Sequence, residues 1–176
     1  YGYASFRLDL TPYIKPGQKN VLAIRLDNPD DTSRWYPGSG IYRNVWLVKT
    51  SPVHVEQWGT FVRNRQVDSE SAVMEMGVNI ENHAGKDVQV KLQTSVYLQG
   101  KDGRPIGEEV TQSTTKDIAI KKDSWSSARF QFKVDKPKLW DIDTPNCYVA
   151  VSRIFMDGKE MDNYETPFGI RTIEFT

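Results

Sequence analysis

The segment from Ser33 to Asn44 holds the densest group of side chains that could contact a ligand. Arg34, Trp35 and Tyr36 stand directly before a Pro-Gly turn, and a further tyrosine and arginine follow that turn. Exposed aromatic rings can stack on sugar rings, and arginine donates hydrogen bonds to hydroxyl and carboxylate groups. The alternative is that the aromatic side chains pack against a neighbouring domain, and composition favours packing over ligand contact.

Nucleophilic catalysis and metal binding find little support in the remaining residue types. His54 and His83 are the only histidines, and neither lies near a serine or cysteine motif. Surface or structural roles are therefore favoured over a catalytic triad. Two histidines far apart in the sequence and one cysteine, Cys147, do not make a metal site. We predict no metal ion and no cofactor.

The acidic residues do not form a catalytic pair either. The carboxylates between Asp27 and Asp31 could bind a hard cation, but they lack the spacing of a known calcium loop, so a solvated turn is favoured. Glu108 and Glu109 are adjacent and point to opposite faces of an extended segment. The carboxylates of a glycosidase must converge on one bond from two sides. We therefore predict that the chain is non-catalytic.

Composition excludes several kinds of partner. The 176 residues carry 23 basic and 23 acidic side chains, so the formal net charge is zero. This gives no electrostatic case for nucleic acid or for an anionic membrane. No apolar run approaches the roughly 20 residues that span a bilayer. The chain opens without methionine on residues typical of a strand, so we expect it to begin inside a longer protein, and its compartment cannot be read from this end.

Alternation of apolar and polar residues recurs along the chain and predicts an all-β protein. From residue 53 onward it marks about seven short strands with turn signals at sandwich spacing. The clearest alternating runs are Met74–Ile80, Val88–Leu98 and Ala128–Val134, whereas Tyr148–Met156 is apolar on both faces, as expected of a central strand. Because one face of most strands is apolar, two sheets packed face to face are expected. We predict an immunoglobulin-like or fibronectin-like β-sandwich over residues 51–176.

The sequence pattern of residues 1–50 differs from that of residues 51–176. Three strands are predicted, Phe6–Leu10, Val21–Asp27 and Ile41–Val48, with one short helical turn over 11–17 that Thr11 can cap. Three strands make at best half a core. We interpret residues 1–50 as the C-terminal strands of a larger sandwich, followed by a boundary at Ser51–Pro52. Such a piece exposes a strand edge and apolar surface, so self-association is expected.

The same segments also carry a family resemblance. Residues 33–47 closely resemble the end of the N-terminal sugar-binding domain of family 2 glycoside hydrolases of the β-galactosidase type. Residues 2–6, 9–17 and 20–23 are similar to the final strands of the same domain. Pro137–Trp140 and Pro145–Tyr148 resemble the family's immunoglobulin-like domain, and Phe168–Arg171 resembles the strand that leads into its catalytic barrel. Single pieces are weak, but they occur in the family's order.

The resemblance implies that the domains of the parent protein have separate roles. In this family a jelly-roll sugar-binding domain precedes an immunoglobulin-like sandwich and then a TIM barrel, which carries both catalytic glutamates. Residues 1–50 would be a partial jelly roll and residues 51–176 the sandwich, in a scaffold for a barrel of the same parent chain. The parent would be a retaining glycosidase. Arg34, Trp35 and Tyr36 would then face the barrel or its substrate pocket, with a galactoside as the ligand. The alternatives are a stand-alone carbohydrate-binding module and an adhesion sandwich.

Overall fold

The computed structural model describes residues 4–27, 40–114 and 117–173. The chain divides into two compact units, which are described separately below. Unit 1 comprises Tyr1–Leu47 and unit 2 comprises Val48–Thr176. No helix in the described ranges is long and apolar enough to cross a bilayer.

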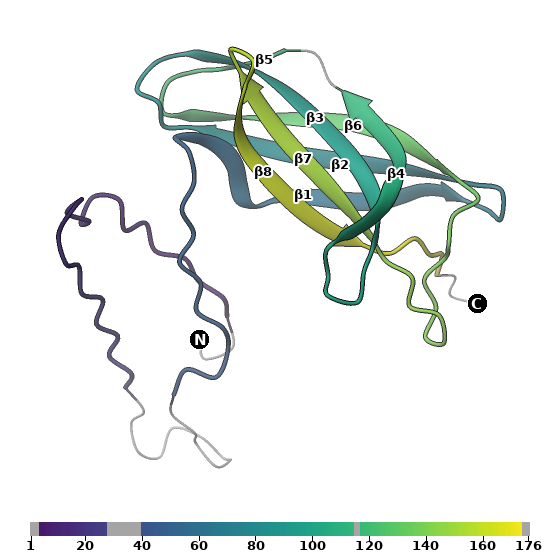
Figure 1. Cartoon of the computed structure of the whole chain (residues 1–176), viewed down its shortest axis with the longest axis horizontal. Coiled ribbons are helices and arrows are strands. Elements are labelled where there is room, and N and C mark those ends of the chain that lie inside the picture. The colour runs from purple at the N-terminus through teal and green to yellow at the C-terminus, as the bar shows by residue number, and fades with distance from the viewer. Residues whose placement is uncertain (1–3, 28–39, 115–116, 174–176) are drawn as a thin grey trace. The chain divides into compact units, whose positions relative to one another are not determined.

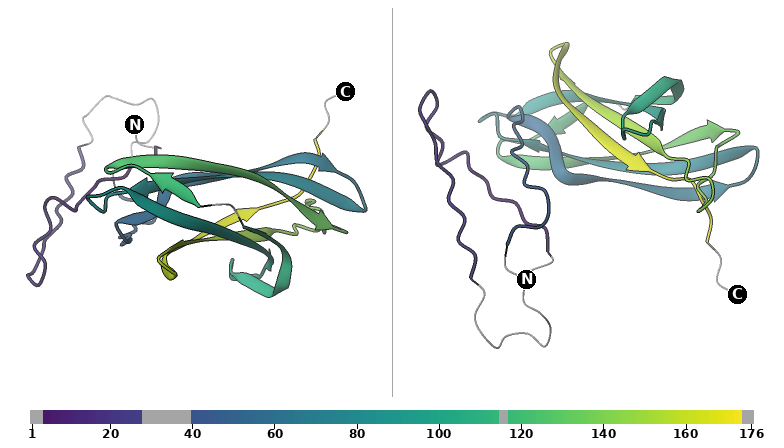
Figure 2. Two further views of the ribbon diagram at one scale, coloured as in Figure 1. Left: turned by 90° about the horizontal axis from the view of Figure 1, so that it is seen from above. Right: turned by 60° about the horizontal axis from the view of Figure 1, so that its bottom comes forward.

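Unit 2 is built from antiparallel β-strands (Figure 1). Its described residues contain β1 (Val53–Val67), β2 (Ser71–Asn82), β3 (Val88–Gln99), β4 (Pro105–Thr114), β5 (Ile118–Ile120), β6 (Ser124–Asp135), β7 (Tyr148–Met156) and β8 (Lys159–Phe168). One sheet has the order β1-β2-β6, and the other has the order β4-β3-β7-β8, with β5 paired to β3. Figure 2 shows the two sheets as separate layers. The all-β and sandwich predictions are therefore confirmed.

The strand order is that of an immunoglobulin-like domain. The β1-β2-β6 sheet corresponds to strands A, B and E of that fold, and β4-β3-β7-β8 corresponds to strands C′, C, F and G. Strand β4 lies between the predicted runs and shows no clear alternation of apolar and polar residues. All five residues from 106 to 110 are exposed, because β4 lies at the sheet edge and buries little of either face. The pattern that identifies a half-buried strand is consequently absent there.

The core lies between the inner faces of the two sheets. On the central strand β2, Met74, Met76, Val78 and Ile80 are each at most 1% exposed. They belong to one apolar cluster with residues of the opposite sheet, including Val90, Leu92, Val96, Ala150 and Ile154. Burying an aliphatic side chain of this size contributes about 1.5–3 kcal/mol. The alternation seen in the sequence is thus the inward face of each strand.

A buried tyrosine anchors the backbone of the segment that connects β6 and β7. The backbone N–H of Lys138 donates a hydrogen bond of 2.7 Å to the hydroxyl of Tyr148, the first residue of β7. The Tyr148 ring stacks on Phe168 with 5.6 Å between centroids. Burial raises the pKa of the Tyr148 hydroxyl, and the hydrogen bond from Lys138 opposes this rise. This arrangement is the tyrosine corner of immunoglobulin-like domains, in which a tyrosine near the start of strand F anchors the backbone upstream.

Side chains of β8 satisfy the free edge of β1. The N–H of Val55 donates to Asp162 Oδ2 at 2.8 Å, and the N–H of Trp58 donates to the Tyr164 hydroxyl at 3.2 Å. Between these sites β1 bulges: Val55 pairs with Ile80 and Thr60 with Val78, so residues 56–59 occupy the place opposite a single residue. These two donors of the β1 edge are therefore not available for pairing with another strand.

Unit 1 shows extended chain without strand pairing in its described residues. The three strands predicted there are therefore not formed as hydrogen-bonded strands. The predicted helical turn is a tight turn in which Tyr13 N–H and Ile14 N–H both donate to the Leu10 carbonyl. Asp9 rather than Thr11 provides the capping oxygen, which accepts from the Thr11 N–H at 2.9 Å.

The apolar side chains of unit 1 remain largely exposed. Phe6, Tyr13, Val21, Trp46 and Leu47 are each at least 77% exposed. The alternation that predicted strands is present, but a strand needs a partner for its backbone groups and a layer to cover its apolar face. The described part of unit 1 contains neither.

Candidate functional site: the C-terminal clamp

The predicted site residues lie outside the described part of the structure. Arg34, Trp35 and Tyr36 fall within residues 28–39, so their contact with a sugar or with another domain stays a prediction. The tyrosine and arginine after the turn are described: the Arg43 guanidinium lies 5.2 Å from the centroid of the Tyr42 ring, which is 64% exposed. These two side chains show that a cation and an aromatic ring associate at the end of unit 1.

Two segments that are distant in the sequence, the loop that holds residues 140–145 and residues 169–171, meet where β8 ends. The N–H of Trp140 donates to the Ile170 carbonyl at 2.8 Å, and Trp140 also forms an isolated β-bridge with Pro145. The Arg171 guanidinium lies 4.7 Å from the centroid of the Trp140 ring. We call Trp140, Pro145, Gly169, Ile170 and Arg171 the C-terminal clamp. Its segments are the same ones that carry the family resemblance in unit 2.

Close packing holds the clamp together. A Cβ atom at Gly169 would lie 3.1 Å from Trp140 Cβ, so only glycine allows this approach without displacement. Ile170 is fully buried in the core. The side-chain amide of Asn64 on β1 donates to the Arg171 carbonyl. Backbone beyond the last residue of β8 is thus fixed by a loop, by the core and by the opposite sheet, which sets the direction in which the chain leaves the sandwich.

The two histidines are brought together, contrary to their separation in the sequence. His54 Nε2 and His83 Nε2 each lie 3.3 Å from Glu81 Oε2, and the two rings are 5.9 Å apart between centroids. The register explains this, because His54 lies directly opposite Glu81 in the β1–β2 ladder. Within the described ranges no group of three His, Cys, Asp or Glu residues has the geometry to hold a metal ion. The sequence alone gives no signal for this cluster of two histidines and Glu81, because the cluster can be recognised only when the pairing register of β1 and β2 is known.

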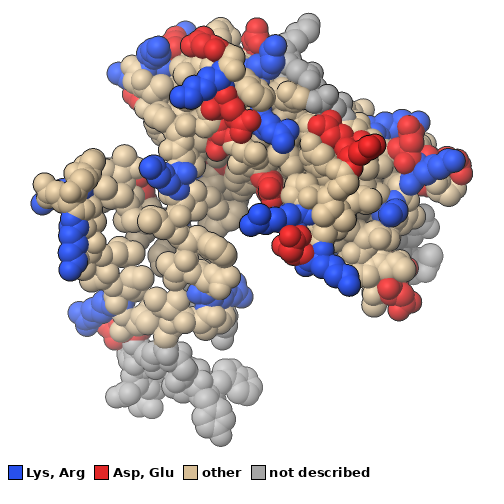
Figure 3. Space-filling view, viewed as in Figure 1, with Lys and Arg blue, Asp and Glu red and all other residues tan. Residues whose placement is uncertain are grey.

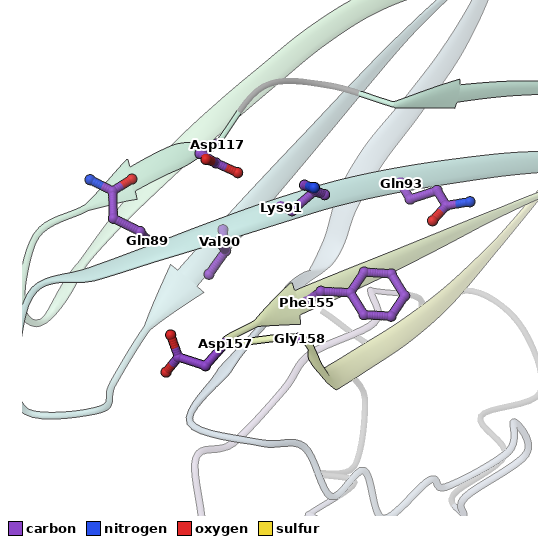
Figure 4. Close-up of a pocket in the computed structure, with 8 residues that line it drawn as sticks. All are labelled: Gln89, Val90, Lys91, Gln93, Asp117, Phe155, Asp157 and Gly158. Atoms are coloured by element: carbon purple, nitrogen blue, oxygen red, sulfur yellow. The ribbon is translucent and has the colours of Figure 1, made fainter.

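A shallow cavity of about 400 Å³ lies on the outer face of the second sheet (Figure 4). Lys91 on β3 and Phe155 on β7 line it, together with Asp117 before β5 and Asp157 in the turn after β7. Figure 4 shows that the two carboxylates lie on different sides of the cavity and do not converge on one point. Such a site lacks the paired carboxylates that glycosidic bond cleavage requires.

Charges of both signs are interspersed over unit 2. On the face drawn in Figure 3, basic and acidic side chains alternate without a large field of one sign. This distribution gives no general electrostatic attraction for a polyanion, in line with the zero formal net charge. Any charged ligand must therefore be recognised by a local group of side chains.

Comparison with known proteins explains why the clamp segments occur in this order. The family model for glycosyl hydrolases family 2 matches residues 53–171, which include the whole clamp. The chain belongs to glycosyl hydrolases family 2. Beta-galactosidase BoGH2A of Bacteroides ovatus is 44% identical over 173 residues, covering 98% of this chain and 20% of the relative. A beta-glucuronidase of Formosa agariphila is 28% identical over 195 residues, covering 99% of this chain and 19% of the relative.

A solved structure of a family member also supports the assignment to family 2. A family 2 member from Bacteroides cellulosilyticus aligns with a TM-score of 0.89 and 32% identity, covering 99% of this chain and 23% of that one. The chain thus spans about a fifth of the length of the family 2 proteins it matches. The predicted family is confirmed, and the match extends through both units.

Proposed function

We propose that this chain is a non-catalytic scaffold within a longer family 2 glycosidase, and that it supports a catalytic TIM barrel of the same parent chain. Residues 1–50 would complete a sugar-binding jelly roll, and residues 51–176 would form the immunoglobulin-like domain between it and the barrel. The C-terminal clamp carries this proposal. It gives the backbone after β8 a defined position, as a domain must do when the following domain has to be held in one orientation.

Physical reasoning supports a scaffolding role for the clamp. Flexible linkers between domains are polar and make few contacts. Residues 169–171 instead combine a buried isoleucine, a glycine pressed against an indole ring and an arginine over the same ring. A chain held in this way transmits the orientation of the sandwich to the segment that follows. Loosening the clamp is expected to affect domain orientation more than the stability of the sandwich.

For the parent protein we propose hydrolysis of a β-galactoside, with the retention of configuration that the family resemblance implies. The relative with 44% identity is named a beta-galactosidase, whereas a putative beta-glucuronidase and a beta-glucuronidase of Formosa agariphila are more distant, at 32% and 28%. The specificity would be set by barrel loops, so the choice between a galactoside and a glucuronide is not encoded in unit 2. Arg34, Trp35 and Tyr36 would add contacts from the end of the jelly roll to the pocket or to the barrel.

A direct assay tests the scaffold proposal. The purified 176-residue chain should release no nitrophenol from nitrophenyl β-D-galactoside or from the corresponding glucuronide above the buffer rate. Turnover at enzymatic rates, retained after further purification, would refute the non-catalytic role. Calorimetry with galactose and lactose separates the stand-alone binding alternative: binding that is abolished by Trp35→Ala but kept in Trp125→Ala, an exposed tryptophan of unit 2, would favour a carbohydrate-binding module instead.

A further inference from the structure

The outer face of the β1-β2-β6 sheet carries a cluster of side chains that neither the core nor the scaffold role uses. Strand register places them in two neighbouring rows. Phe61, Gly77 and Arg129 lie opposite one another across the three strands, and the next row is Arg63, Glu75 and Gln131. We call Phe61, Arg63, Arg65, Glu75 and Arg129 the arginine platform. All five belong to strands of unit 2 and point away from the core.

An aromatic ring forms the centre of the platform. A Cβ atom at Gly77 would lie 2.1 Å from Phe61 Cε1 and 2.5 Å from Cζ, so the Phe61 ring rests directly on the glycine backbone. One side of the ring is thereby covered, and the residue keeps 38% of its surface exposed. The guanidinium groups of Arg63 and Arg129 each lie 5.7 Å from the ring centroid. Cation–π contacts of this kind hold both cations beside the ring.

A buried carboxylate orients two of the three arginines. Glu75 accepts hydrogen bonds from Arg63 at 2.8 and 2.5 Å on Oε1, and from Arg65 at 3.0 and 2.5 Å on Oε2. Both arginines reach it because a register shift between Asn64 and Gln66 makes Arg65 an extra residue in β1. These bonds hold the pKa of the Glu75 carboxyl below its usual value. The arginine side chains remain about half exposed.

Arg129 differs from the other two arginines. Its described contact is with the Phe61 ring, and no carboxylate of the described residues lies within ion-pair distance of it. Three arginines and one glutamate give the platform a net charge of +2, whereas the chain as a whole has a formal net charge of zero. In the next row towards the bulge of β1, Asn79 lies opposite Ser127 and donates to the Glu56 carboxylate at 2.9 Å, so one acidic side chain borders the platform. The surface therefore combines a preorganised cation, an aromatic ring and hydrogen-bonding groups on a flat sheet.

We propose that the arginine platform binds a sugar that carries a carboxylate, with Arg129 as the principal anion contact and the exposed part of Phe61 as an apolar contact. Guanidinium groups match carboxylates in geometry, and aromatic rings match the apolar faces of sugar rings. A saccharide needs only a small polar surface with one aromatic contact. This site is independent of the proposed scaffold role.

The experiment is calorimetric titration of the 176-residue chain with tetragalacturonic acid, and with neutral β-1,4-galactotetraose as the comparison ligand. We expect binding of the acidic tetramer and at least a tenfold weaker interaction with the neutral one. Arg129→Gln should weaken binding of the acidic tetramer at least tenfold. Raising the salt from 0.15 to 0.5 M should also weaken it, because the contact is electrostatic and partly exposed.

Matched variants separate recognition from general charge and from folding. Arg104→Gln makes the same change in charge within the exposed turn between β3 and β4, and it should leave binding unchanged. Arg129→Gln should change the thermal midpoint only slightly, because the side chain is exposed and loses only its contact with the Phe61 ring. Absence of heat with the acidic tetramer at millimolar concentration would overturn the proposal. Equal affinity for both tetramers, or equal losses in Arg104→Gln and Arg129→Gln, would overturn it as well.

Discussion

Replacing Gly77 by alanine should have opposite effects on stability depending on the residue at position 61. The new methyl group would occupy space that the Phe61 ring fills, since a Cβ atom at position 77 would lie within 2.8 Å of three ring atoms. Phe61 stands on the sheet surface, so its side chain can swing into solvent rather than distort the backbone. The substitution thus replaces glycine by a residue that is more favourable in a β-strand, but it also displaces the Phe61 ring into solvent.

The size of the effect follows from burial. Phe61 is 38% exposed, so about three-fifths of its surface is covered, and full burial of a phenylalanine is worth about 1.5–3 kcal/mol. Expelling the ring should therefore cost about 1–2 kcal/mol. Alanine in place of glycine within a strand returns about 0.5–1 kcal/mol. We expect Gly77→Ala to lower the free energy of unfolding by about 1 kcal/mol when Phe61 is present.

In a Phe61→Ala background the ring is already absent, so only the gain from replacing glycine remains. Gly77→Ala should then raise the free energy of unfolding by about 0.5 kcal/mol. Urea denaturation of the four proteins, followed by far-ultraviolet circular dichroism, measures this cycle. If Gly77→Ala changes stability in the same direction in both backgrounds, the ring does not rest on Gly77 and the basis of the platform is wrong.

Three further outcomes are expected. Tyr148→Phe should lower the free energy of unfolding by about 1 kcal/mol through loss of the bond from Lys138. Because the folded-state pKa of Tyr148 is raised above its usual 10.0, the native protein should lose stability as pH rises above 10, and this loss should be smaller in the variant. Glu75 has a lowered pKa, so its stabilising effect, present above its usual pKa of 4.5, should disappear as pH falls towards the lower folded-state value. Acid titration of Glu75→Gln should show a weaker dependence there, and an unchanged profile would contradict the pairing. Sedimentation should show that the whole chain self-associates through the exposed apolar residues of unit 1, whereas a chain lacking residues 1–47 stays monomeric. Equal behaviour of the two chains would refute this.

Many strands of unit 2 can be predicted from the alternation of apolar and polar residues in the sequence. Met74–Ile80 and Ala128–Val134 each place an apolar residue at every second position, and most of these residues are buried in the structure. Alternation predicts a strand reliably where one face is buried and the other is solvated. It failed for β4, in which residues 106–110 are all exposed, and it overstated unit 1, where the apolar faces have no covering layer among the described residues.

By itself the sequence determined the fold class, the family and the order of the segments that resemble it, because these depend on residue type and spacing along one chain. Only the tertiary structure decided which residues meet across strands. Trp140 meets Arg171 in the C-terminal clamp, His54 meets Glu81, and Phe61 covers Gly77. The physical reason is that a period of two shows which face a residue occupies but not which strand lies beside it. Pairing and register depend on packing between segments that are far apart in the chain.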